Sequence, residues 1–62
     1  DGPAVVRIGL LVTLTLEFPD SGMADRAALL PGVERQGRRI SYSAEDMVTA
    51  FKAMRSALAL AG

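Results

Sequence analysis

The chain has 62 residues, half of them hydrophobic, with seven acidic and seven basic side chains and with neither cysteine nor histidine. This length allows one small domain, and the lack of cysteine excludes the disulfides and thiolate metal sites that often reinforce small folds. The balanced charge removes the simplest argument for a nucleic-acid or anionic-membrane partner.

We expect residues 1–3 to be a disordered tail or a remnant of processing and residues 4–62 to form a single small domain. The lack of cysteine favours a cytoplasmic location. The longest apolar run, residues 9–16, is far shorter than the roughly 20 residues of a membrane-spanning helix, so no membrane partner is expected.

The stretch Ala4–Phe18, AVVRIGLLVTLTLEF, is apolar at every even-numbered position and mixed at the odd ones. This alternation predicts a β-strand with one buried face. A straight strand of this length would measure about 50 Å, whereas a compact domain of this size is about 27 Å across. Three readings remain open: Gly9 breaks the strand, the strand extends and pairs with another chain, or it begins only at Leu10.

The next segments are shorter and are read from their turn residues. Pro19, Asp20, Ser21 and Gly22 end the strand. Asp20 or Ser21 then caps a helix over residues 23–30, although a loop or a strand over residues 27–30 also fits. Residues 33–42 predict a β-hairpin with Gln36-Gly37 at its tip.

Residues 44–60 predict an amphipathic helix, with Ser43 as its cap and Gly62 as its end. Five apolar residues share one predicted face, flanked by Ala50 and Ala57, and that face is expected to pack on the sheet. They are Met47, Phe51, Met54, Leu58 and Ala61.

The expected fold is therefore α+β, with a long N-terminal antiparallel strand and a hairpin packed on one C-terminal helix. Because so small a core barely balances the entropy of folding, we expect oligomerisation to complete it, with a homodimer favoured. The expected interface is the odd-numbered face of the long strand: Val5, Arg7, Gly9, Leu11 and Thr13.

The sequence offers little catalytic chemistry. Without histidine or cysteine, the common nucleophile–base pairs and most transition-metal sites are missing. The carboxylates Glu17, Asp20 and Asp25 follow the strand but match no calcium loop, and we interpret them as solvated turn residues. We therefore expect no catalytic residue, no cofactor, no metal and no enzyme activity.

One concentration of charge remains, at Arg35, Arg38 and Arg39 around the hairpin tip. Three guanidinium groups could bind nucleic-acid phosphates, doubled in a dimer. Glu34 beside them and the lack of an aromatic stacking platform argue for a charged edge that resists aggregation instead.

These observations favour a small, non-catalytic, self-assembling interaction module that uses the long strand as its interface. The first alternative is a dimeric nucleic-acid-binding protein that uses the arginine hairpin. The second is a small subunit or excised domain of a larger enzyme. No motif in the sequence is specific enough to assign a family.

Overall fold

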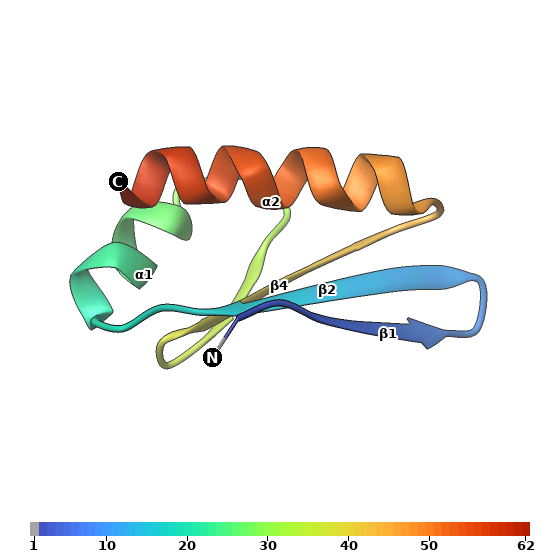
Figure 1. Cartoon of the computed structure of the whole chain (residues 1–62), viewed down its shortest axis with the longest axis horizontal. Helices are drawn as coiled ribbons and strands as arrows, with labels where there is room; N and C mark the ends of the chain where they lie inside the picture. Colours follow the sequence, from blue (N-terminus) through green and yellow to red (C-terminus); the bar gives the residue numbers. More distant parts are fainter. Residues whose placement is uncertain (1) are drawn as a thin grey trace.

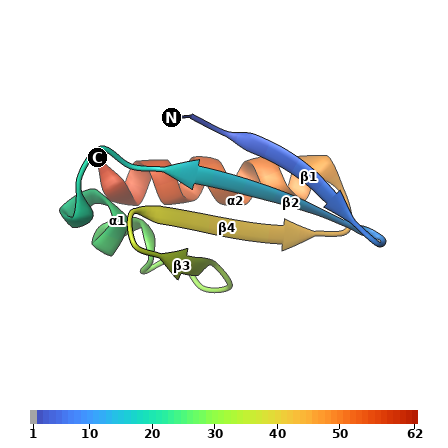
Figure 2. The same ribbon diagram turned by 90° about the horizontal axis from the view of Figure 1, so that it is seen from below.

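A computed structural model describes residues 2–62, without the side chains of Arg7 and Ile8. Four antiparallel strands form one sheet in the order β1-β2-β4-β3, and two helices lie on one face of it (Figures 1 and 2). The expected α+β class, with a C-terminal helix packed on the sheet, is confirmed. In chain order the elements are β1 (Ala4–Ile8), β2 (Leu11–Glu17), α1 (Ser21–Ala27), β3 (Glu34–Gln36), β4 (Arg39–Ala44) and α2 (Met47–Ala61).

The long apolar stretch is folded back on itself at Gly9. β1 and β2 are antiparallel neighbours joined by the two residues Gly9 and Leu10. Gly9 has a φ of 60°, which fits the first position of a two-residue hairpin turn and is favourable only for glycine. The structure thus follows the reading in which Gly9 breaks the strand, and the chain extends only 32 Å along its longest axis.

This hairpin corrects the expectation that all even positions share one buried face. Ala4 pairs with Thr15 and Val5 with Leu14, so odd residues of β1 share a face with even residues of β2. Residues directly opposite in an antiparallel pair point to the same side. The buried face therefore carries Leu14 from β2 and Val5 from β1.

The helix after β2 is present, and Asp20, one of the two predicted caps, is its cap. α1 begins at Ser21 and ends at Ala27, two to three residues earlier than expected at either end. The Asp20 carboxylate accepts a hydrogen bond of 2.9 Å from the Met23 backbone N–H. The hairpin of β3 and β4 is also present, but its turn is Gly37-Arg38 and not Gln36-Gly37, because Gln36 pairs with Arg39.

The start of α2 differs from the prediction. Residues 43 and 44 belong to β4, and Asp46, not Ser43, caps the helix. The Asp46 carboxylate accepts hydrogen bonds from the Thr49 backbone N–H at 2.8 Å and from its hydroxyl at 3.1 Å. At the other end, the Gly62 N–H donates to the Leu58 carbonyl at 3.1 Å, as a helix stop requires.

The face of α2 that packs on the sheet is made mainly of alanine. Its buried residues are Ala50, Met54, Ala57 and Ala61. Three members of the expected stripe are partly exposed instead, and Phe51 and Leu58 expose about half of their surface. Small residues let a helix approach its neighbours closely, and α1 presents Ala24 and Ala27 in the same way. The core is completed by Val12, Leu14, Ile40 and Ala44 from the sheet and by Phe18, which follows β2.

No helix within residues 2–62 combines the length and apolar character needed to cross a lipid bilayer.

Candidate functional site

The sheet face opposite the helices carries a ladder of hydroxyl groups. Thr13 lies opposite Ser43, and Thr15 lies opposite Ser41, in neighbouring strands β2 and β4. Their side-chain oxygens are 2.7 Å and 3.1 Å apart, respectively. This outer face is therefore polar and preorganised across its two central strands.

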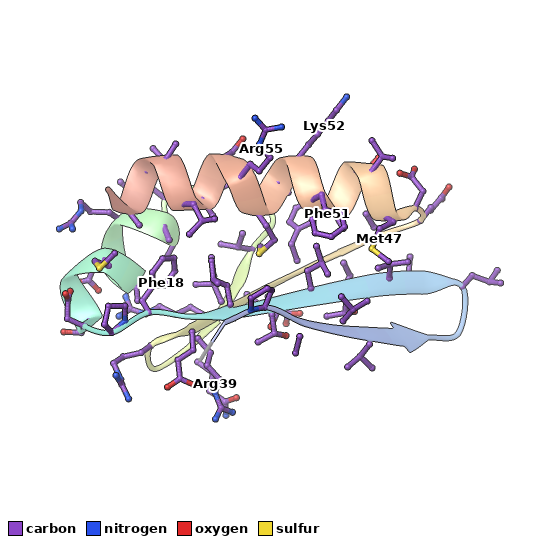
Figure 3. The ribbon with its side chains drawn as sticks, viewed as in Figure 1. Phe18, Arg39, Met47, Phe51, Lys52 and Arg55 are labelled. Atoms are coloured by element: carbon purple, nitrogen blue, oxygen red, sulfur yellow. The ribbon has the colours of Figure 1, made fainter. Side chains whose placement is uncertain are left out.

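A carboxylate shared by two arginines lies at the end of this ladder. Glu17 accepts a hydrogen bond of 2.9 Å from Arg39 and one of 3.3 Å from Arg38. The hydrogen bond from Arg39 is the main cause that lowers the pKa of Glu17 below its ordinary value. Glu17 is therefore ionised at neutral pH and is a poor general base. Figure 3 shows Arg39 on the side of the sheet away from α2.

The structure brings the three predicted arginines to one hairpin, but each is already bound within the chain. Arg35 forms an ion pair with Asp25 and donates to the Gly37 carbonyl at 2.8 Å. Arg38 also donates to two backbone carbonyls that follow β2, at 3.3 Å and 3.1 Å. These bonds tie the hairpin to α1 and to the end of β2. A nucleic-acid role remains a prediction without support from this geometry.

Between the ladder and β3, the outer face forms an open hollow of about 510 Å³. Hydroxyl, amide and guanidinium groups can bind a polar or anionic ligand by hydrogen bonds. A nucleophile needs an adjacent base, and the chain has no histidine to provide one. Within residues 2–62, no group of three or more acidic side chains comes together as a metal site. The hollow is lined by Thr15, Glu34, Arg35, Gln36, Arg39 and Ser41.

The predicted interface residues do not share one face. Val5 lies opposite Leu14 and thus on the helix side of the sheet, whereas Thr13 lies on the outer face. Gly9 is in the turn, and Leu11 begins β2 with about two fifths of its surface exposed. The Arg7 side chain is outside the described part of the structure. Contact with a partner remains a prediction for these residues.

Sequence reasoning did not single out the hydroxyl ladder. Its signal is the spacing Thr13-x-Thr15-x-Glu17 in one strand and Arg39-x-Ser41-x-Ser43 in another. Alternation places each set on a single face, but only the register shows that the two sets meet.

A family model described as Peptidase_M55: D-aminopeptidase matches residues 3–56, and the chain belongs to this family. No curated protein and no solved structure matches the chain. The family match contradicts the expectation that this protein is not an enzyme. That expectation was wrong because it rested on the reactive side chains of this chain alone, whereas the family match points to a peptidase.

Proposed function

Because the chain belongs to the D-aminopeptidase family, we propose that it works as one part of a larger enzyme that releases D-amino acids from the amino ends of peptides. The observation that carries this proposal is the match over residues 3–56, which includes every strand and most of α2. It corresponds to the second alternative from the sequence, a subunit or excised domain of a larger enzyme.

In this proposal the groups that cleave the peptide come from other segments or chains. Peptide hydrolysis needs an activated water or nucleophile and a group that stabilises the developing oxyanion. The chain has no histidine or cysteine, and the carboxylate at the end of the hydroxyl ladder, Glu17, is held ionised by two arginines. These features suit the binding and support of a site better than bond cleavage.

The contribution of this part is a small sheet whose outer face is polar across its two central strands, β2 and β4. The hydroxyl ladder is fixed by cross-strand hydrogen bonds, and the Arg38 and Arg39 side chains are fixed by Glu17. Side chains held in this way can position neighbouring loops or a polar substrate without losing much conformational entropy on binding.

The first step of the test is to sequence the gene on both sides of the region that encodes the chain, which gives the complete reading frame. The complete reading frame and the 62-residue chain are expressed separately and assayed with D-alanine p-nitroanilide and its L enantiomer, with and without added divalent metal. We expect the complete product to hydrolyse the D substrate in preference to the L substrate, and the chain alone to hydrolyse neither.

Three results would contradict the proposal. They are a complete product without preference for the D substrate, turnover by the chain alone, and a reading frame no longer than the chain. The second result would leave the family activity intact but would place the catalytic groups within these 62 residues.

A further inference from the structure

The two edges of the sheet differ in how they are protected. β3 is a three-residue strand of charged and polar side chains, Glu34–Gln36, and such edges resist pairing with other chains. β1, at the opposite edge, exposes about half of Val5 and Val6. The side chains of β1 that the structure describes, those of Ala4, Val5 and Val6, are apolar.

An apolar groove continues the β1 edge on the helix side of the sheet. α2 packs against β2 and β4, leaving Val5 half exposed. In Figure 3, Phe51 points from α2 towards the sheet, whereas Lys52 and Arg55 point away from it. The groove has a volume of about 140 Å³ and is lined by Pro3, Leu14, Leu16, Phe51, Met54, Arg55 and Leu58.

The edge of β1 is complementary to itself. In a two-residue hairpin the closing pair, here residues 8 and 11, is hydrogen-bonded, and hydrogen-bonded and unbonded positions then alternate along the strand. The backbone groups of residues 5 and 7 therefore point away from β2, symmetrically about Val6. In an antiparallel second copy related by a two-fold axis at that residue, residue 5 lies opposite residue 7, and residue 7 lies opposite residue 5. Each of these two pairs can then form backbone hydrogen bonds between the copies.

We propose that two copies of this chain associate through their β1 edges, with Val6 opposite Val6, to form one continuous sheet of eight strands. Both α2 helices then lie on the same face, and Phe51 and Leu58 of each copy cover Val5 at the junction. The formal net charge of zero means that two copies do not repel each other. This proposal stands on the edge and the groove and does not depend on the proposed enzyme function.

The area of the exposed patch at the β1 edge limits the affinity expected for the dimer. The β1 patch comprises six exposed residues, with roughly 500 Å² of exposed surface per copy, against about 800 Å² per partner in a standard interface. We therefore expect a weak dimer, with a Kd of roughly 1–100 µM. The patch consists of Pro3, Ala4, Val5, Val6, Phe51 and Leu58.

Sedimentation equilibrium of the 62-residue chain tests the association. The mass is expected to rise with concentration from 6.5 kDa towards twice that value. Val6→Lys places a charge on the pairing edge and should raise the Kd at least about tenfold. Val48→Lys is the matched control, because Val48 is 62% exposed on α2 and lies outside the patch. Circular dichroism checks that both variants fold.

A crosslinking experiment tests the register independently. Opposed residues at an unbonded position of an antiparallel pair have Cα atoms about 4.5 Å apart, within the range of a disulfide. In this cysteine-free chain, Val6→Cys should therefore oxidise to a covalent dimer much faster than Val48→Cys. A chain that stays monomeric at every concentration, or equal effects at residues 6 and 48, would overturn the proposal.

Discussion

The packing of α2 through alanine gives a direct test of the fold. Ala57 has no exposed surface, whereas its neighbour Leu58 is 49% exposed. Ala57→Leu adds three carbons to a closed space, and overpacking of this kind costs about 1–3 kcal/mol. Complete burial of a leucine side chain contributes about 1.5–3 kcal/mol, so half burial makes the cost of Leu58→Ala only about 0.8–1.5 kcal/mol.

Urea denaturation followed by circular dichroism at the helix signal measures both free energies of unfolding. At about 0.05–0.15 kcal/mol per residue, the whole domain has roughly 3–9 kcal/mol of stability, so either loss is resolvable. Each kcal/mol should also lower the Tm by about 4–8 °C. Ala59→Leu is the control, because Ala59 is exposed on the same helix and its replacement should change stability by less than about 0.5 kcal/mol.

The measurement belongs at low micromolar concentration, so that any self-association through Leu58 does not add to its apparent contribution. A larger loss for Leu58→Ala than for Ala57→Leu would refute the packing described here. It would show that the apolar stripe expected from the sequence, and not the alanine face, packs on the sheet.

Three further predictions concern the turn, the helix junction and the helix cap. Gly9→Ala should destabilise the chain by about 1–2 kcal/mol in the same assay, because φ is 60° there; a neutral result would mean that the turn is different. Arg26 donates to the Ala61 carbonyl at 3.1 Å and 2.8 Å, so Arg26→Gln should cost about 1 kcal/mol in a thermal melt, and no loss would show that this link between the helices is not formed in solution. The hydrogen bond from the Thr49 N–H lowers the pKa of Asp46 in the folded chain, so its stabilising effect is present above the unfolded pKa and is lost as the pH falls through the folded value. Stability measured from about pH 6 to pH 2 should therefore fall less for Asp46→Asn than for the unsubstituted chain, and parallel curves would contradict this assignment.

Much of the local structure could be predicted because it follows from single residues or short spacings. Asp20, one of two predicted caps, caps α1, and Gly62 ends α2 as its position predicts. Asp46 shows the limit of this reasoning, because Ser43 and Asp46 are both good caps and the choice depends on how far β4 extends. β4 reaches Ala44 because that residue pairs with Val12 and is buried, a tertiary contact that the local sequence does not encode.

The hairpin at Gly9 could be anticipated only as one of three readings. The length of the apolar stretch required a break or a partner, and Gly9 was the residue best suited to a break. A turn and a bend at Gly9, however, predict opposite orientations for the side chains of β1. After a two-residue turn, the odd-numbered residues of β1 lie on the same face as the even-numbered residues of β2. Since Gly9 breaks the strand within one chain, strand length no longer supports assembly, and the case for a dimer now depends on the exposed β1 edge.

The function could not be reached from residue chemistry because an active site is assembled from segments that are distant in sequence. A chain without histidine can still belong to a peptidase family if its task is to support groups carried elsewhere. The family match extends over residues 3–56 and includes the sheet and the arginine hairpin, neither of which has a reactive side-chain pattern. The bonds that hold Arg38 and Arg39 to Glu17 fit such a supporting task, because they fix side chains without creating a reactive one. If that is their task, Glu17→Gln in the complete enzyme should weaken substrate binding or stability and leave the chemical step at bound substrate nearly unchanged.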